Sequence, residues 1–576
     1  MLEEHPLSTT PQPSDLPLAS TAQRLGWGIL IVVTLYICYF SHLGVIGFVG
    51  PDEPRYAWIA RDMAETGDWV TPRLYGKPWF EKPPLLYWGG AIFFKLFGSS
   101  APEVAARLPS AISALLATLA LAWLAWRTYG EECARWLLLL LPTSVGMIGF
   151  SHAAATDMPF AGMLTIAMVC AAVALGLTQS ENTPILPHTP WLALLLLGFF
   201  LGLAVLAKGP AAIILSGGAI FFWAIFTKRW RHARRLLHPA AIATFCLTAL
   251  PWYILCARRN PDFFRIFIIE HNFKRYLTPE FQHVQPFWFY IPILLIAFLP
   301  WITLGLWAAY SATIEFSRNK TGQLGALLLS YSLFCLLFFS ASKSKLPGYI
   351  LPAIPTIGLL LARIVQTNKL RYRKSFVGSG LVGALLFFLA AVFAVFVLSG
   401  RIAVRSNEMA IVVLGFVSFC FALANLFLIF VRWQRTLPSQ IPLPPLAAPP
   451  VLVAVILSHF LLMIFFPYDP SGRTLTYEIR PEIAARPDLF IGKMNRGKHY
   501  SLNFYLKKEI PDWDQKSPRT GLLLMESKNC SAIVPAPFTC SSEPFEFYAS
   551  GIFGYQISRS DSLERLGDRG KPKQKE

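Results

Sequence analysis

The sequence predicts an all-α, polytopic membrane protein of about thirteen spans, followed by a small α/β domain. Of its 576 residues, 54% are hydrophobic and 15% are charged, whereas soluble domains carry about 25% charged residues. Apolar runs long enough to cross a bilayer recur from residue 25 to residue 467. Beyond Pro467 the charge rises and the apolar runs shorten, which indicates a domain outside the membrane.

The net charge is +18, and the positions of its basic residues favour a membrane over nucleic acid as the partner. Lys and Arg concentrate in loops between apolar runs, and this is the pattern that orients membrane proteins. We find no basic, aromatic-interleaved segment of the kind that binds DNA or RNA. The sequence therefore predicts membrane lipids as partners and no nucleic acid.

Residues 1–21 are polar and rich in Pro and Ser, and we expect a disordered cytoplasmic N-terminus. No signal-peptide cleavage pattern precedes the first apolar run, so we expect that run to be retained. Residues 22–467 form the predicted transmembrane domain. Its spans are expected at about 25–43, 104–126, 134–150, 158–177, 190–207, 210–227, 236–256, 287–310, 324–341, 346–366, 376–398, 409–431 and 449–467.

The basic loops predict the orientation. With a cytoplasmic N-terminus, the inner loops include 228–235, 318–320, 369–374 and 432–435, all strongly basic. The outer segments are then 44–103, 151–157, 257–286, 342–345 and everything after 467. Basic residues in these outer segments are interleaved with acids and aromatics.

The first outer segment holds the longest polar interruption in the apolar part of the chain. Pro54 suits the first turn of a helix that Asp52 or Glu53 can cap. An apolar stripe at helical spacing follows, and Gly67 is a natural stop. Its residues are Tyr56, Ile59, Ala60 and Met63. We expect a helix lying in the membrane interface, and the alternative is a capped surface helix whose acids complement its dipole.

Other outer segments add charge to the same face. Asp157 lies where one span meets the next, and Lys208 precedes a tight turn. The remaining candidates are Glu81, Lys82, Glu270, His271, Lys274, Arg275, Lys343, Lys345 and Tyr349. Singly, each has a simpler explanation: a lysine anchors a span end, a histidine lies in a loop, and an acid before proline caps a helix.

Together, these groups suit the chemistry of a lipid-linked phosphate. Lys and Arg bind such a phosphate at the membrane surface. When it departs as a leaving group, cations or a metal must stabilise its charge. A carboxylate serves as base when the acceptor is a hydroxyl. Glycosyl transfer from a lipid phosphate meets all of these conditions.

The C-terminal segment 468–576 is expected to form a small domain with strands near 522–526 and 545–549. Its two cysteines, Cys530 and Cys540, are able to form a disulfide if the domain is extracytoplasmic. The stretch after Ser558 is charged, and we expect it to be frayed.

Six segments resemble the bacterial aminoarabinose (4-amino-4-deoxy-L-arabinose) lipid A transferase family, which is related to protein O-mannosyltransferases. They are PDEPRYAWIARDM, ETGDW, FEKPPLLYW, AKGP, EHNFKRY and SKLPGYILP, in the family's order. DEPRYA followed by FEKPP is specific as a pair. The resemblance implies a GT-C type bundle with interfacial helices in 44–103 and a periplasmic domain at 468–576. It also implies inverting transfer of the sugar from undecaprenyl phosphate to lipid A, on the periplasmic side of the bacterial inner membrane.

The resemblance also implies roles for residues. Asp52 matches the catalytic carboxylate, with Glu53 beside it, and Asp157 matches a second acid of the fold. Glu81, with His271, resembles a metal-proximal position, so the resemblance allows a divalent ion such as zinc, magnesium or manganese. The contacts and supporting cations for the donor phosphate are Arg55, Lys82, Lys208, Arg275, Lys343, Lys345 and Tyr349. The chain departs from the family pattern in KSK at 343–345 and at Gly348.

Two alternatives stay open. The first is the same reaction with a hexuronic acid, mannose or hexosamine, passed to a lipid, glycan or protein, since one scaffold can serve several substrates. The second is a transporter of a polyprenyl-linked sugar. Transporters place charged groups at mid-membrane depth near broken helices, whereas the charges here lie at span ends.

Overall fold

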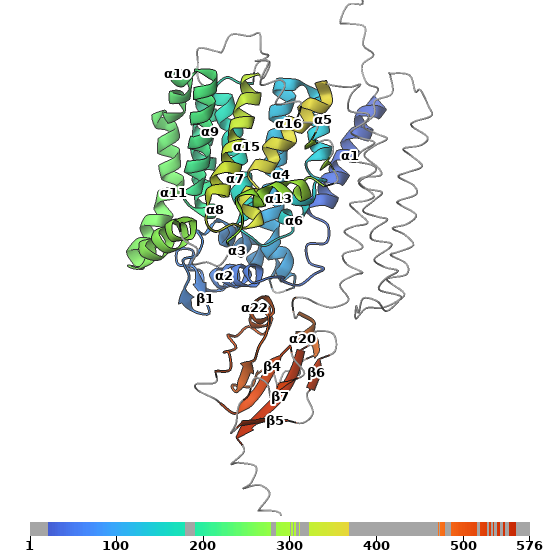
Figure 1. The fold of residues 1–576 in the computed structure, drawn as a ribbon, viewed down its shortest axis with the longest axis vertical. Coiled ribbons are helices and arrows are strands. Elements are labelled where there is room, and N and C mark those ends of the chain that lie inside the picture. The colour runs from blue at the N-terminus through green and yellow to red at the C-terminus, as the bar shows by residue number, and fades with distance from the viewer. Residues whose placement is uncertain are drawn as a thin grey trace, which may run out of the picture.

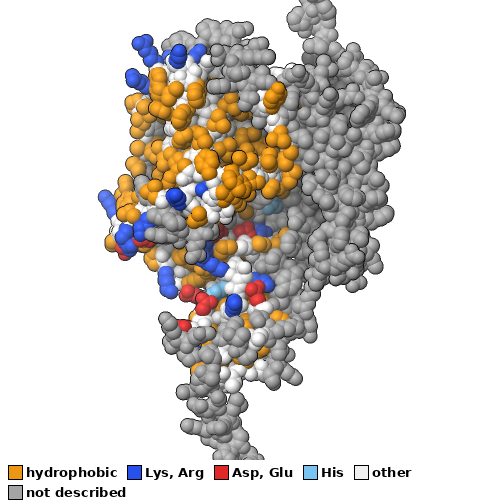
Figure 2. All heavy atoms as spheres, in the orientation of Figure 1, with side chains coloured by type: hydrophobic (Ala, Val, Ile, Leu, Met, Phe, Trp, Pro, Cys, Tyr) orange, Lys and Arg blue, Asp and Glu red, His pale blue; other side chains and the backbone are white. Residues whose placement is uncertain are grey.

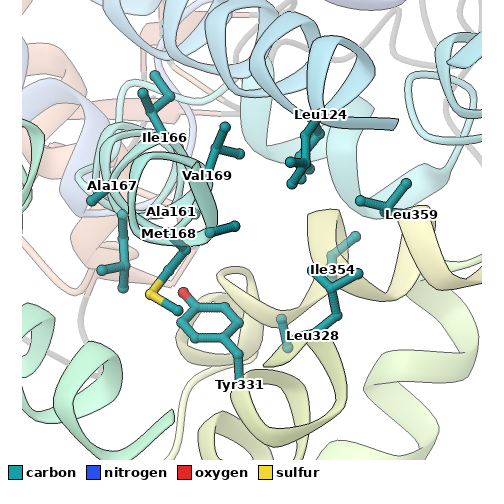
Figure 3. Close-up of a cluster of buried hydrophobic side chains, with 14 of the residues drawn as sticks. Leu124, Ala161, Ile166, Ala167, Met168, Val169, Leu328, Tyr331, Ile354 and Leu359 are labelled. Atoms are coloured by element: carbon teal, nitrogen blue, oxygen red, sulfur yellow. The ribbon is translucent and has the colours of Figure 1, made fainter. Parts of the chain in front are cut away.

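Helix α7 (Asp157–Ala174) stands at the centre of a bundle of apolar helices in the computed structural model (Figure 1). Within it, 89% of the residues are buried. Figure 3 shows Met168 of α7 next to Tyr331 of a second helix, α15 (Gln323–Ala341). A helix that is apolar all round is stable only when other apolar surface or lipid surrounds it, so α7 forms the axis of the bundle.

The structure describes residues 21–98, 100–178, 190–277, 284–299 and 322–367, and parts of 301–310 and 471–559. The bundle and its connections contain α1 (Thr21–Tyr39), α4 (Pro102–Tyr129), α5 (Glu131–Leu140), α6 (Val145–Ser151), α8 (Trp191–Lys208), α9 (Ala211–Thr227), α10 (Trp230–Ala233), η2 (Arg234–Leu237), α11 (Pro239–Arg259), η3 (Arg265–Lys274), α12 (Arg275–Leu277), η4 (Phe287–Phe289), α13 (Tyr290–Ala297), η5 (Pro347–Ile350) and α16 (Ala353–Thr367).

The helices match the predicted spans as far as the described residues reach. Five are long and apolar enough to cross a membrane, and the bent pair α5–α6, with 65° between its halves, makes a sixth. Shorter apolar helices stand at four further predicted spans, namely α1, α9, α13 and α16. The predicted spans 376–398, 409–431 and 449–467 lie outside the described residues. The total of thirteen therefore stays a prediction.

The two ends of the bundle differ in charge. Figure 2 shows hydrophobic side chains over its flank and Lys and Arg at its upper end. The basic segment there contains Lys228, Arg229, Arg231, Arg234 and Arg235, around α10 and η2. At the lower end, charged side chains of both signs lie below the apolar surface (Figure 2).

Across the lower end lies α2 (Asp52–Thr66), as Figure 1 shows. The predicted stripe is confirmed, because Tyr56, Ile59, Ala60 and Met63 are all buried. The helix ends at Gly67, whose φ of 74° is a left-handed conformation that favours glycine. The predicted acidic cap is wrong: the N-cap is Pro51, and no side chain caps the helix.

After α2 the chain forms a short hairpin and a second apolar helix. Strands β1 (Arg73–Leu74) and β2 (Lys77–Pro78) pair antiparallel, with Leu74 opposite Lys77. Tyr75 and Gly76 both have positive φ, as a two-residue hairpin turn requires. Helix α3 (Leu85–Phe97) follows and packs on both α2 and α4.

Asp68 links parts of this outer segment to one another and to the bundle, through hydrogen bonds and ion pairs. Its carboxylate accepts hydrogen bonds from the backbone N–H groups of Val70 and Thr71, at 3.0 and 3.2 Å. It also pairs with Arg73 and with Arg259 of α11, at 3.3 and 3.1 Å. Burial alone would raise the pKa of Asp68, but these donors and cations lower it below its ordinary value.

The C-terminal segment contains a small sheet of five strands, in the order β3-β4-β7-β5 with β6 also on β7. The strands are β3 (Leu489–Ile491), β4 (Gly521–Met525), β5 (Phe538–Cys540), β6 (Phe545–Phe547) and β7 (Ile552–Arg559). Strand β3 runs parallel to β4, with Phe490 opposite Leu523, and the other pairs are antiparallel. Helices α20 (Arg473–Glu478) and α22 (Arg496–Tyr505) complete the described part. Cys530 and Cys540, whose pairing the sequence leaves open, form a disulfide.

Candidate active site

Four charged side chains meet where α2 begins. The Arg55 guanidinium pairs with Asp52 one turn before it and with Glu81 at 3.1 Å. Lys82 lies 3.7 Å from the other oxygen of Glu81. The Arg55, Glu81 and Lys82 side chains are only 6%, 11% and 13% exposed, whereas Asp52 is 49% exposed. Of these four groups, Asp52 is therefore the one most open to an incoming molecule.

Arg55 holds this cluster in place. Its Nε donates to the carbonyl of Pro51 at 2.8 Å, so the guanidinium is fixed against the start of its own helix. Burial alone would lower the pKa of Arg55, but Glu81, Tyr56 and Asp52 around it raise that pKa above its ordinary value. Arg55 is therefore a permanent cation that fixes the spacing of two carboxylates.

Glu53 points away from this cluster. Its carboxylate accepts backbone hydrogen bonds from Val49 and Ala154, both at 2.8 Å. It also accepts two bonds from Arg107 of α4, at 3.0 and 2.8 Å. These contacts favour a structural role over the predicted catalytic one. Nothing in the sequence marks Arg107 as a partner of Glu53, because its position in an apolar run resembles an ordinary span end.

A second cluster forms at the ends of other helices. Asp157, at the start of α7, accepts a hydrogen bond from the Lys208 ammonium at 2.6 Å. That ammonium also lies 4.6 Å from the ring centroid of Tyr349 in η5. A Cβ on Gly348 would lie 2.4 Å from Oδ1 of Asp157, so only glycine leaves room for this carboxylate. Asp157, Lys208 and Tyr349 are thus brought together as the sequence predicts.

The segments that carry the two clusters are neighbours. Phe80, which precedes Glu81, packs in one apolar cluster with Leu206, two residues before Lys208. Phe263 and Phe267 belong to the same cluster, and the Phe80 and Phe263 rings meet edge to face at 5.3 Å between centroids. Packed aromatic side chains of this kind hold segments in fixed relative positions.

Two buried donors at the first cluster have no hydrogen-bond partner among the described residues. They are Nε1 of Trp79 and the hydroxyl of Tyr87. The Trp79 ring lies 5.4 Å from the Arg55 guanidinium, and the Tyr87 ring lies 5.7 Å from that of Tyr56. An unsatisfied buried donor is costly, so both groups store a polar requirement beside the charged cluster. Sequence reasoning missed them because aromatic residues near a membrane ordinarily pack as anchors.

The remaining predicted residues are placed differently. Lys345 is buried, and its Nζ donates to the carbonyls of Gln285 and Ser342, at 3.0 and 2.6 Å. Burial lowers the pKa of Lys345, and Lys343 lowers it further. Lys343 itself is exposed. Arg275 begins α12, and its side chain lies outside the described residues. These contacts favour a structural role for Lys345.

The two predicted metal ligands, Glu81 and His271, lie in separate segments of the described chain. His271 lies in the π-helix η3, and among the described residues no group of three or more His, Cys, Asp or Glu side chains is arranged to hold an ion. The Glu81 carboxylate already faces two cations, Arg55 and Lys82. A divalent cation there would meet two like charges. A metal at Glu81 and His271 stays a prediction.

Comparisons with known proteins identify the relatives of this chain. The profile of dolichyl-phosphate-mannose-protein mannosyltransferases matches residues 27–267. The undecaprenyl phosphate-alpha-4-amino-4-deoxy-L-arabinose arabinosyl transferase of Edwardsiella ictaluri is 32% identical over 406 residues, which are 68% of this chain and 70% of that protein. Its namesake from Erwinia tasmaniensis is 33% identical over 338 residues, and the match spans 58% of this chain and 59% of that protein's length.

A solved structure shows the fold. The crystal structure of ArnT from Cupriavidus metallidurans bound to undecaprenyl phosphate matches with a TM-score of 0.72 at 22% identity. The match covers 92% of this chain and 98% of that one. The architecture expected from the sequence, a GT-C type helical bundle, is therefore confirmed at the level of the fold.

Proposed function

Since the chain belongs to the undecaprenyl phosphate-alpha-4-amino-4-deoxy-L-arabinose arabinosyl transferase family, we propose that it transfers 4-amino-4-deoxy-L-arabinose from undecaprenyl phosphate to lipid A. The names of its relatives support the sugar and the lipid carrier. The ArnT structure bound to undecaprenyl phosphate supports the same carrier. The observation that carries the proposal is the pair of charged clusters at one end of an apolar bundle.

In the proposed reaction, an oxygen of the acceptor attacks the anomeric carbon of the sugar from the face opposite the donor phosphate. A bond from that carbon to the acceptor oxygen forms, and its bond to the undecaprenyl phosphate oxygen breaks. The electron pair leaves with undecaprenyl phosphate, so negative charge grows on the departing oxygen. Cations near that oxygen lower the barrier because they bind it more strongly as it charges.

The described cations that suit this task are Lys82 and Lys208. Both are largely buried, and low exposure strengthens their attraction to a phosphate. Each is held by one carboxylate, Glu81 and Asp157 respectively. Tyr349 lies beside Lys208 and is the neutral donor of this group. We place the donor phosphate at these residues, with Arg275 as a further expected contact.

Asp52 takes a different role in the proposal. When the acceptor is a phosphate of lipid A, the attacking oxygen is already ionised at neutral pH and needs no strong base. Asp52 then orients the sugar through hydrogen bonds and balances its ammonium group.

The proposed location is the periplasmic face of the bacterial inner membrane. The basic segment around α10 lies at the end of the bundle opposite α2 (Figure 1). Cytoplasmic loops carry the excess of Lys and Arg. The charged clusters would therefore face the periplasm, where lipid A and the lipid-linked donor meet.

Lipid A mass spectrometry tests this function in cells. Bacteria that lack their own transferase, but still make the donor, are supplied with this chain. We expect lipid A to gain the mass of one 4-amino-4-deoxy-pentose residue. Unchanged lipid A would refute the proposed acceptor, and a different mass increment would identify another sugar.

A further inference from the structure

The C-terminal domain contacts the outer end of the bundle through α22. Asn503, which is 1% exposed, donates to the hydroxyl of Tyr75 at 3.1 Å. The carbonyl of Phe504 accepts a hydrogen bond from Arg61 of α2 at 3.0 Å, and the Tyr505 hydroxyl donates to Glu103 of α4 at 2.6 Å. These contacts fix α22 against the β1–β2 hairpin, α2 and α4. Figure 1 shows α22 next to α2.

One turn before these anchors, α22 carries Tyr500, whose ring lies 5.3 Å from the Arg55 guanidinium. Residues three and four apart share a helix face, so the anchors at 503 and 504 set the position of Tyr500. The Trp79 ring lies 5.4 Å from the same guanidinium. One aromatic ring thus comes from the first outer segment and the other from a domain more than 400 residues later in the chain.

We propose that Tyr500 is a positioning residue for the active site, through which the C-terminal domain holds Arg55 between Asp52 and Glu81. The proposal deepens the proposed function and rests on it. A guanidinium near an aromatic face is attracted by the ring's negative charge density, most strongly where water is excluded. Arg55 is 6% exposed and has carboxylates beside it, so the Tyr500 ring near its guanidinium limits where it can move.

This arrangement gives the C-terminal domain a part in the chemistry. Arg55 fixes Asp52 one turn before it and Glu81 from the next segment. If the ring is lost, Arg55 gains freedom and Asp52 loses its fixed position over the sugar. Small misplacements of such groups lower the rate of transfer more than they weaken substrate binding. The donor phosphate, which the proposal places at Lys82 and Lys208, would bind nearly as before, because both lysines keep their own carboxylate partners.

Two variants of Tyr500 and a control separate a positioning role from general stability. Tyr500→Phe keeps the ring and should transfer at close to the wild-type rate. Tyr500→Leu removes it and should lower kcat about tenfold with little change in the KM for the donor. The control, Phe538→Leu, removes an aromatic ring that packs on Trp513 in the sheet of the same domain. It should leave transfer unchanged.

A double variant makes the test specific. In an Arg55→Met background, Tyr500→Leu should cause no further loss, because the ring then has no guanidinium to hold. Equal rates for wild type and Tyr500→Leu would overturn the proposal. A loss of transfer rate in Tyr500→Phe as large as in Tyr500→Leu would also overturn it. The same holds if Tyr500→Leu lowers the rate of the Arg55→Met protein as much as it lowers the rate of wild type.

Amide hydrogen exchange tests the contact between Tyr500 and Arg55 without an assay of sugar transfer. The peptide Asp52–Thr66 should exchange faster in Tyr500→Leu than in wild type, and at the wild-type rate in Tyr500→Phe. Equal exchange in all three proteins overturns the inference. If wild type transfers no sugar but exchange changes as expected, the proposed function fails while the positioning contact stands.

Discussion

Replacing Glu53 with Gln tests whether the second acid of the first outer segment is structural. The change keeps the shape of the side chain and removes its charge. In wild type, the carboxylate pairs with Arg107, which is 5% exposed and also donates to the carbonyls of Leu43, Ile46 and Gly47. Glu53→Gln therefore leaves a buried guanidinium without its anion.

The magnitude follows from that burial. Breaking a buried ion pair by removing one partner costs about 3–5 kcal/mol. The Gln carbonyl still accepts some of the bonds, so we expect the free energy of unfolding to fall by about 3 kcal/mol. Glu131→Gln is the matched control, because Glu131 pairs with Arg135 on the surface and is 63% exposed. It should cost less than about 0.5 kcal/mol.

Thermal unfolding of the detergent-solubilised protein measures the difference, and transfer per folded molecule is measured alongside it. Glu53→Gln should melt well below wild type and below Glu131→Gln, while the folded fraction stays active. A Glu53→Gln protein that melts like wild type but transfers no sugar would refute the structural assignment and restore the catalytic one.

Three further predictions follow from single contacts. Gly348→Ala should displace Asp157 and lower the transfer rate at least tenfold in a folded protein, because its Cβ would overlap Oδ1; a wild-type rate would contradict this. Lys208→Met should weaken binding of undecaprenyl phosphate, whereas Lys345→Met should lower the melting temperature and spare binding; the reverse result would exchange their roles. Asp68 has a lowered pKa, so its contribution to stability is present above the ordinary carboxyl pKa of about 3.9 and is lost as the pH falls through its own pKa. Asp68→Asn should therefore melt below wild type at pH 7, with a gap that closes at strongly acidic pH; a gap that does not depend on pH would contradict the assignment.

Local patterns predicted much of the first outer segment. The stripe of Tyr56, Ile59, Ala60 and Met63 follows from helical periodicity, and each of these residues is buried. The stop at Gly67 follows from the need for a left-handed residue after the last turn. These features depend only on neighbours within a few residues.

Contacts between distant segments were not predictable. Periodicity places Arg61 on the exposed side of α2, but the structure buries it because the carbonyl of Phe504, 443 residues later, accepts its hydrogen bond. The same holds for Glu53, whose partner Arg107 lies on another helix. The partners of a charged side chain are equally hard to predict. The sequence position of Lys345 does not reveal that two backbone carbonyls accept hydrogen bonds from its ammonium.

The most direct measurement is a transfer assay with purified protein, aminoarabinosyl undecaprenyl phosphate and lipid A. Wild type should form modified lipid A and release undecaprenyl phosphate in equal amounts. Asp52→Asn should lose at least about a hundredfold in rate with an unchanged melting temperature, while Glu65→Gln, an exposed acid on the same helix, should keep the wild-type rate. A wild-type protein that leaves the donor intact, or an Asp52→Asn protein that transfers at the wild-type rate, would contradict the account.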